Sequence, residues 1–222
     1  GSEGDKAMKV VDCIQGSPEW HAARCGRATA SRVPDIVRKI KSGAPSKMRV
    51  TYAGELIAER LSGVQPQDGF VSPAMQFGKD MEDQAAATYG FMHDIEPIKV
   101  GFVIHPTIDM AGASPDRLIG DHGLIQVKVP NTATHIESLL GGEIEPDYVK
   151  QMQWELACTK RQWIDFVSFD PRLPPHMQLH TKRVARDDKY IAELEEQVRI
   201  FLNELDQKLA ALNARYGLEK AA

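Results

Sequence analysis

Asp116, Gln126 and Lys128 are the residues whose types and spacing are best suited to chemistry. They lie in the segment Gly112-Ala-Ser-Pro-Asp116-Arg-Leu-Ile-Gly-Asp-His-Gly-Leu-Ile-Gln126-Val-Lys128. This segment predicts a β-hairpin in which residues 121–123 make the turn and residues 124–129 form the returning strand. Because side chains alternate along a strand, Gln126 and Lys128 share one face, opposite Val127. A carboxylate, an amide and an ammonium group therefore converge beside the turn, which is the outline of a phosphodiester-cutting site with one carboxylate missing.

The chemistry of divalent metals explains why these residue types belong together. Mg²⁺ prefers oxygen ligands and keeps several waters, so a nuclease site supplies one or two carboxylates. The bound ion lowers the pKa of its water and neutralises charge on the phosphate. A lysine beside it can orient the attacking water and stabilise the added negative charge. We therefore expect Mg²⁺ as the cofactor, with Mn²⁺ able to replace it.

The same residues carry a resemblance to the PD-(D/E)XK nuclease superfamily. Ser-Pro-Asp116 and Lys128 match its pattern, and Gln126 occupies the position of its glutamate. Further segments resemble the phage-type alkaline exonucleases, also called the lambda exonuclease or YqaJ family. In chain order they are Trp20-His-Ala-Ala-Arg24-Cys-Gly-Arg-Ala-Thr-Ala-Ser31, Gly78-Lys-Asp-Met-Glu82, Gln151-Met-Gln153 and Phe169-Asp-Pro-Arg172. The resemblance extends over residues 20–190, which is most of the chain.

The resemblance implies roles for individual residues. Asp116, position 126 and the Val127 carbonyl would hold the metal ion. Lys128 would position the attacking water, with Glu82 and Gln151 supporting the site and Glu82 placed near the metal or its water. Alternatives stay open, because Glu82 could be an exposed helix residue and Gln151 could serve only helix packing.

The resemblance also implies a binding site for DNA and its 5′-phosphate. Arg24 with Ser31 would form a pocket for the 5′-phosphate of the degraded strand, since a guanidinium binds phosphate in bidentate fashion. Ser114 could touch phosphate or cap a turn. Lys41 lies in a basic loop, and Met75 could form an apolar wedge against DNA bases or belong to the core.

Composition places the chain among ordinary globular domains. Its 222 residues are 42% hydrophobic and 26% charged, with a net charge of −4, and we expect a single domain from residue 8 to residue 222. Residues 1–7 are interpreted as a remnant of the expression vector. The three scattered cysteines predict reduced thiols. No membrane-spanning run or signal peptide is expected, so we expect a cytoplasmic protein. The resemblance implies a bacterial host cell and a phage or prophage origin.

The distribution of charge is more informative than its sum. Eight basic residues and one acid lie between Arg24 and Arg49, whereas residues 187–222 hold eight acids and five bases. A local basic face on an acidic protein favours DNA binding, although a solvated surface is the simpler interpretation of an isolated charge run.

The order of elements predicts an α/β fold. A short helix is expected to begin at residues 17–19, and a second to run from Thr29 or Ser31 to about residue 40. Further helices are expected at residues 49–61, 72–89, 132–140, 147–159 and 187–216, and strands at 99–104, 163–169 and 177–184 beside the hairpin. This order predicts a mixed central sheet flanked by helices, with a long C-terminal helix. The resemblance implies that the sheet is a restriction-endonuclease-like core.

The expected function is a Mg²⁺-dependent, processive 5′→3′ exonuclease on linear double-stranded DNA. It would release 5′-mononucleotides and leave 3′ single-stranded tails for homologous recombination. The resemblance further implies a homotrimer that threads DNA ends and a single-strand annealing protein as partner. Two alternatives are a structure-selective endonuclease and a DNA-end-binding protein without turnover. The second follows if Gln126, as a natural variant or an engineered change, abolishes metal binding.

Overall fold

The computed structural model describes residues 8–66 and 70–217. The expected vector remnant, residues 1–7, lies outside this range. The elements in chain order are β1 (Lys9–Val11), α1 (Pro18–Arg24), β2 (Ala28–Thr29), η2 (Ala30–Arg32), α2 (Val33–Val37), α3 (Lys47–Ser62), α4 (Pro73–His93), β3 (Phe102–Ile104), β4 (Ala111–Ala113), β5 (Arg117–Ile119), β6 (Gly123–Lys128), α5 (Thr132–Leu139), α6 (Pro146–Thr159), β7 (Trp163–Phe169), η3 (Pro175–Met177), β8 (Leu179–Ala185) and α7 (Asp188–Tyr216).

The strands form two four-stranded sheets, in the orders β1-β3-β4-β2 and β5-β6-β7-β8. Each sheet is mixed, because β2 runs parallel to β4 and β6 runs parallel to β7, while the other pairs are antiparallel. The α/β class is confirmed, but the expected central sheet is divided. The division falls at Ser114-Pro115-Asp116, between β4 and β5, where proline has no N–H to donate to a strand ladder.

The second sheet is covered by a helix on each face. Leu124 and Phe166 pack with Met152 and Leu156 of α6. On the opposite face, Ile125 and Val167 pack with Tyr89 and Ala86 of α4. This alternation fixes the direction of the side chains of β6. Odd-numbered residues of β6 face α4, and even-numbered residues, including Gln126 and Lys128, face α6.

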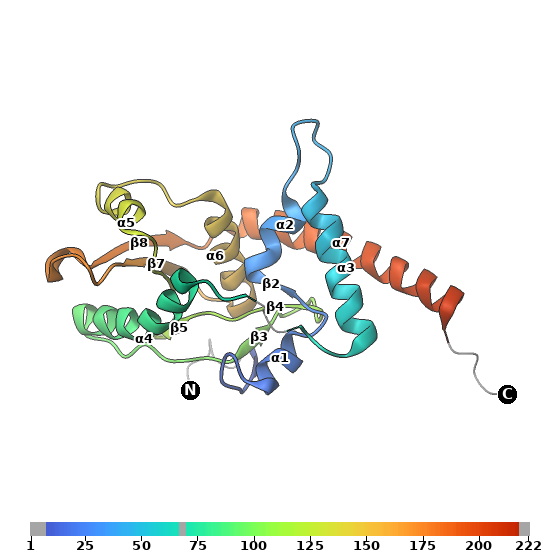
Figure 1. Cartoon of the computed structure of the whole chain (residues 1–222), viewed down its shortest axis with the longest axis horizontal. Helices are drawn as coiled ribbons and strands as arrows, with labels where there is room; N and C mark the ends of the chain where they lie inside the picture. The colour runs from blue at the N-terminus through green and yellow to red at the C-terminus, as the bar shows by residue number, and fades with distance from the viewer. Residues whose placement is uncertain (1–7, 67–69, 218–222) are drawn as a thin grey trace.

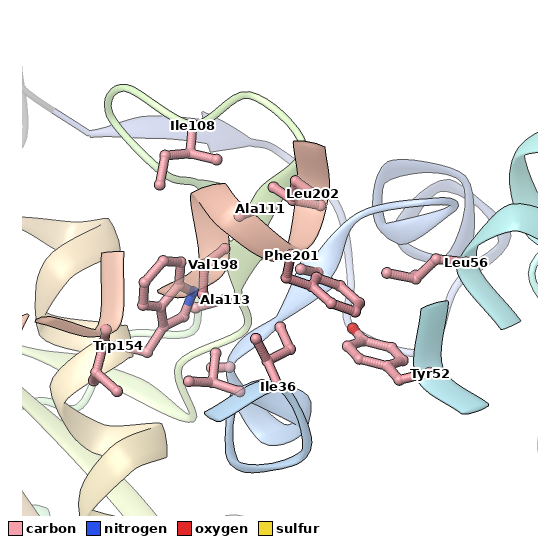
Figure 2. Close-up of a cluster of buried hydrophobic side chains, with 14 of the residues drawn as sticks. Ile36, Tyr52, Leu56, Ile108, Ala111, Ala113, Trp154, Val198, Phe201 and Leu202 are labelled. Atoms are coloured by element: carbon pink, nitrogen blue, oxygen red, sulfur yellow. The ribbon is translucent and has the colours of Figure 1, made fainter. Parts of the chain in front are cut away.

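The largest core lies where the first sheet meets α2, α3, α6 and α7, elements that lie close together in Figure 1. Figure 2 shows Phe201 of α7 between Tyr52 and Leu56 of α3 on one side and Trp154 of α6 on the other. The Tyr52 and Phe201 rings stack with centroids 5.7 Å apart. Burial of these large apolar side chains holds α6 in place, and α6 in turn carries Gln151.

Most of the predicted elements are confirmed, with shifts at their ends. The hairpin forms as β5 and β6, and β7 has the predicted bounds. Ser17 caps α1, and Gly63 ends α3 in the left-handed conformation. Several boundaries differ, including the start of β3 at Phe102 instead of residue 99. The second helix is the short η2–α2 pair, and α4 continues through Gly90 to His93 because Asp94 adopts the left-handed conformation that ends the helix.

Candidate active site

Asp116 lies at the start of β5, and its carboxylate points across the hairpin. Its Oδ2 accepts a hydrogen bond of 2.6 Å from the Val127 backbone N–H. Burial, and then the neighbouring Glu82 carboxylate, raises the pKa of Asp116 to about 7, from a usual value of 3.8. The Val127 N–H, Lys128 and Arg117 act in the opposite direction. The net effect disfavours the charged form of Asp116, and a bound cation would stabilise that form.

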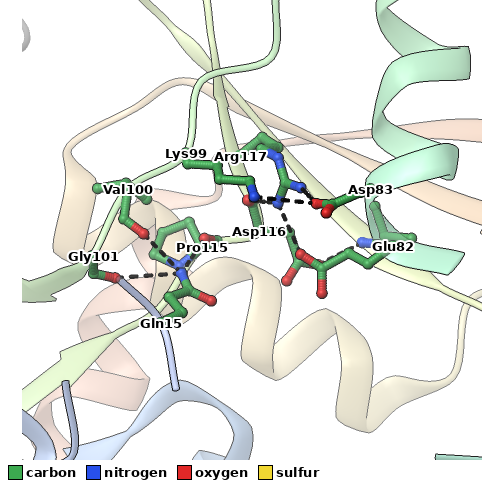
Figure 3. Close-up of polar contacts among 10 residues, drawn as sticks. Gln15, Glu82, Asp83, Lys99, Val100, Gly101, Pro115, Asp116 and Arg117 are labelled. Carbon is green, nitrogen blue, oxygen red and sulfur yellow. Dashed lines mark hydrogen bonds and ion pairs between the residues drawn. The ribbon is translucent and has the colours of Figure 1, made fainter. Parts of the chain in front are cut away.

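Arg117 joins Asp116 to the helix that carries Glu82. Its Nη1 donates to Glu82 Oε1 at 2.8 Å and to the Asp116 carbonyl at 2.6 Å, while Nη2 donates to Asp83 Oδ1 at 2.5 Å. Figure 3 shows the Asp116 and Glu82 carboxylates turned toward the same space beneath this guanidinium. A cavity of about 670 Å³ opens there, lined by all four of these side chains. Arg117 therefore fixes Glu82 beside Asp116.

Gln126 faces α6, as the alternation along β6 requires, and its side chain is 2% exposed. In the amide orientation that satisfies both ends of the side chain, its oxygen accepts from Lys128 Nζ at 3.2 Å and from Gln151 Nε2 at 3.1 Å, and its nitrogen donates to Glu155 Oε2 at 3.2 Å. Lys128 Nζ also lies 4.5 Å from the centre of the Tyr148 ring, a cation–π contact. Gln126, Lys128 and Gln151 are thus brought together as expected.

A second cavity, of about 210 Å³, lies on the α6 side of the site. Its lining includes Trp20, Arg24, Ser31, Ser114, Gln151 and Glu155. Gln15 lines both cavities, so they adjoin. Gln15 is held by donating to the carbonyls of Val100 (2.9 Å), Gly101 (3.3 Å) and Pro115 (2.9 Å), as Figure 3 shows.

Aromatic and polar contacts organise this smaller cavity. The Arg24 guanidinium carbon lies 3.9 Å from the centre of a Trp20 ring, and Arg24 Nη1 donates to Gln65 Oε1 at 3.4 Å. Trp20 Nε1 donates to Ser114 Oγ at 2.9 Å. The structure thus brings together Arg24, Ser31 and Ser114. Their role toward a 5′-phosphate stays a prediction.

Lys41 and Met75 do not join either cavity. Lys41 is exposed in the loop between α2 and α3, which projects from the body in Figure 1. Met75 is 49% exposed in the first turn of α4, near Phe70 and Val71, which are also exposed. The core interpretation of Met75 is therefore wrong, and the wedge interpretation stays a prediction.

Several basic residues between Arg24 and Arg49 form ion pairs with acidic side chains. Arg32 pairs with Asp35 and Glu55, Arg38 with Asp147, and Arg49 with Glu204 of α7. The basic run and the acidic C-terminal helix are therefore not separate surfaces at Arg49, because α7 packs directly on α3. At the site itself the basic side chains are Lys128, Arg24 and Arg117, of which Arg117 pairs with Glu82 and Asp83.

The donor atoms at the site suit a hard cation. Carboxylate oxygens of Asp116 and Glu82, the Gln126 amide oxygen and the Val127 carbonyl are all oxygen donors of the kind that Mg²⁺ selects. Within residues 8–66 and 70–217, no three His, Cys, Asp or Glu side chains are grouped as a metal site. The three cysteines are free, as expected.

Sequence reasoning missed Arg117, Gln15 and Glu155. Arg117 directly follows Asp116, but nothing in its spacing shows that it reaches α4. Gln15 acts through main-chain carbonyls, which leave no pattern in a sequence. Glu155 had a usable signal, because it stands four residues after Gln151 and therefore on the same helix face.

Comparison with known proteins agrees with this geometry. Residues 19–162 match the family described as the YqaJ-like viral recombinase domain. A fragment of 80 residues is 31% identical to the uncharacterised protein ExoD of Escherichia coli (strain K12), covering 35% of this chain and 91% of that protein.

Solved structures give the same result. LHK-Exo, an alkaline exonuclease from Laribacter hongkongensis that was also crystallised with dAMP, is 46% identical. The match covers 90% of this chain and 97% of that chain with a TM-score of 0.82. A phage-related exonuclease from Haemophilus somnus 129PT shares the fold at 17% identity, with coverage of 84% and 96% and a TM-score of 0.62.

Among the described helices, none is long and apolar enough to cross a bilayer. The family match covers more than half of the chain and includes the hairpin, α4 and α6. The chain therefore belongs to the YqaJ-like viral recombinase domains, the family of phage-type alkaline exonucleases.

Proposed function

We propose that the protein is a Mg²⁺-dependent, processive 5′→3′ exonuclease that acts on ends of linear double-stranded DNA. One observation carries this proposal. The cluster of Asp116, Lys128 and Gln151 directly adjoins the cavity that contains Arg24 and Ser31. A cutting site next to a pocket of suitable size and charge for a terminal phosphate favours cleavage close to a 5′ end.

Asp116, the Gln126 amide oxygen and the Val127 carbonyl would hold the metal ion, with Glu82 near its water shell. The raised pKa of Asp116 supports this assignment, since burial and Glu82 disfavour an isolated anion there. When bound, Mg²⁺ would lower the pKa of a water and neutralise charge on the phosphate.

Lys128 has the role of positioning the attacking water and stabilising negative charge on the phosphate. Its ammonium lies against the Tyr148 ring and is held by the Gln126 oxygen at 3.2 Å. Gln151 donates to the same oxygen and so restrains it from the α6 side. These contacts limit the rotamers of Lys128, which suits a group that must orient a small molecule.

Arg24 would bind the terminal 5′-phosphate, together with the hydroxyls of Ser31 and Ser114. Its stacking on Trp20 fixes the plane of the guanidinium, so that less conformational entropy is lost when phosphate binds. The short distance between a bound end and the cutting site supports release of 5′-mononucleotides. The complex of LHK-Exo with dAMP, a mononucleotide, supports the same product class.

We further propose a homotrimer that threads the duplex, and a single-strand annealing protein as the partner that receives the 3′ tails. Family membership supports both. The same membership supports action in homologous recombination in the cytoplasm of a bacterial host, with a phage or prophage as the source.

Incubation of the protein with linear and with circular duplex in Mg²⁺ tests the proposal. We expect loss of linear DNA only, release of mononucleotides and a growing 3′ single-stranded tail. Cutting of both substrates would identify an endonuclease. The neutral Gln126 favours one second candidate, a DNA-end-binding protein, for which the linear duplex would be bound and left intact.

A further inference from the structure

We propose that Glu155 of α6 supplies the metal-ligating carboxylate that position 126 of β6 lacks. This inference rests on the proposed metal-dependent nuclease function. Compared with the family pattern, which has a glutamate on the strand, the second acid would stand on the facing helix. The site would then keep two carboxylates at its centre, Asp116 and Glu155, although the strand offers only an amide.

The helix places Glu155 where such a ligand is needed. Residues four apart on an α-helix lie on the same face, so Glu155 accompanies Gln151 on the face of α6 that meets Gln126 and Lys128. Met152 and Leu156, the residues beside them, are fully buried against the second sheet and hold that face in register. Glu155 is 2% exposed and lines the cavity shared with Ser114 and Arg24.

The contact with Gln126 is direct. The Gln126 amide nitrogen donates to Glu155 Oε2 at 3.2 Å, while its oxygen faces Lys128 and Gln151. A glutamine at position 126 can orient a neighbouring carboxylate in this way. A glutamate there would have no proton to donate and would repel it. The amide at position 126 and the acid at position 155 are therefore complementary.

The charge of the site also favours a further cation. Burial, and then the nearby Asp116 carboxylate, raises the pKa of Glu155, and Lys128 is the cation that opposes this. Two other buried acids of the chain have arginine partners, since Asp165 pairs with Arg183 and Asp170 with Arg172. A divalent ion that joins the Asp116 and Glu155 carboxylates would add to the compensation that Lys128 gives to both and that Arg117 gives to Asp116.

A purely structural role makes a different prediction from a ligand role. If Glu155 serves only to accept the Gln126 hydrogen bond, glutamine at position 155 can accept the same bond. Metal affinity would then fall only slightly, because Glu155→Gln keeps the shape and removes a charge that does not contact the ion.

The test is Mn²⁺ binding to the full chain without DNA, measured by calorimetry and by electron paramagnetic resonance of free Mn²⁺. We expect Glu155→Gln to weaken binding on the order of 10- to 100-fold, the range seen when groups that support a metal site are removed. The exchange variant Gln126→Glu/Glu155→Gln returns the carboxylate to the strand and should recover most of the affinity. Asp165→Asn is the control, because Asp165 is buried on the opposite face of the same sheet with Tyr89 and Arg183.

Three results would overturn the inference: no Mn²⁺ binding by the unchanged chain, unchanged or only slightly weakened binding by Glu155→Gln, or loss that the exchange variant does not recover although it folds. Circular dichroism melting monitors the folding of each variant. A different result would refute the proposed function alone. If the unchanged chain binds Mn²⁺ through Glu155 but leaves linear duplex intact, the exonuclease proposal is wrong and the ligand assignment stands.

Discussion

Replacing Asp116 with asparagine should stabilise the metal-free protein at alkaline pH. The substitution keeps a side-chain oxygen that can accept from the Val127 N–H, which now lies 2.6 Å from Asp116 Oδ2. It removes the negative charge that burial and Glu82 disfavour. The residue that we propose as a metal ligand is therefore expected to destabilise the fold when the metal is absent.

The sign follows from the pKa shift. The pKa of Asp116 is about 7 in the folded protein and 3.8 as the usual value. Between about pH 4 and pH 7, the folded state therefore holds a proton that the unfolded state has released, so stability falls as pH rises through this window. At 1.36 kcal/mol per pKa unit, a shift of about three units gives a free-energy cost of about 4 kcal/mol as an upper bound above pH 7.

Urea denaturation in EDTA at pH 5 and pH 8 measures this cost. We expect the free energy of unfolding of the unchanged protein to fall by several kcal/mol between the two pH values relative to Asp116→Asn. For a chain of this size, each kcal/mol shifts Tm by about 2–4 °C, so the variant should melt several degrees higher at pH 8. Mg²⁺ should reverse the order, because it stabilises only the protein that binds it.

Asp165→Asn is the matched control. Asp165 accepts from Arg183 at 2.8 Å and from the Tyr89 hydroxyl at 2.6 Å, so its loss should destabilise the protein at both pH values. Parallel pH dependence of the unchanged protein and Asp116→Asn in EDTA would refute the electrostatic argument for Asp116.

Three further predictions follow from the site. Gln126→Glu should raise Mg²⁺ affinity and the single-turnover rate on the order of tenfold, equivalent to about 1.4 kcal/mol, because it adds an anionic oxygen beside Asp116 and the bound ion offsets the repulsion of Glu155. Calorimetry and rapid-mixing digestion check this, and unchanged values would show that position 126 is not a ligand. Arg24→Ala should slow digestion of 5′-phosphorylated ends on the order of tenfold or more and change digestion of 5′-hydroxyl ends little, because only the former offers a dianion; equal slowing of both would assign Arg24 to folding or general DNA affinity. Light scattering after size exclusion should give the mass of three chains, and the mass of one chain at every micromolar concentration would exclude the trimer.

The fold could be predicted where local patterns decide it. The hairpin was visible because alternating residues flank a turn with glycine, and the confirmed caps at Ser17 and Gly63 follow from local hydrogen bonding and backbone freedom. The short strands β1, β2 and β4 were missed. They contain two or three residues each, too few for a periodic pattern, and are held by pairing with distant partners such as β3.

The candidate site could be predicted only in part, for a related reason. The strand residues Asp116, Gln126 and Lys128 are neighbours in one hairpin, so sequence spacing places them together. Arg117 and Glu155 contact residues of other elements. Arg117 of β5 reaches Glu82 of α4, which is 35 residues away in the sequence, and Glu155 of α6 reaches Gln126 of β6, which is 29 residues away. Contacts of this kind depend on how helices pack on the sheet, which the core around Phe201 and Trp154 determines.

The neutral residue at position 126 has different consequences once α6 is in place. Considered alone, an amide in place of a carboxylate lowers the charge available to a divalent cation and favours a binding protein without turnover. With Glu155 at 3.2 Å from that amide, the negative charge is retained within the same small volume. Because electrostatic attraction depends on distance and burial and not on the element that carries the charge, an acid on α6 can serve the cation as an acid on β6 would. The substitution at position 126 is therefore compatible with an active nuclease.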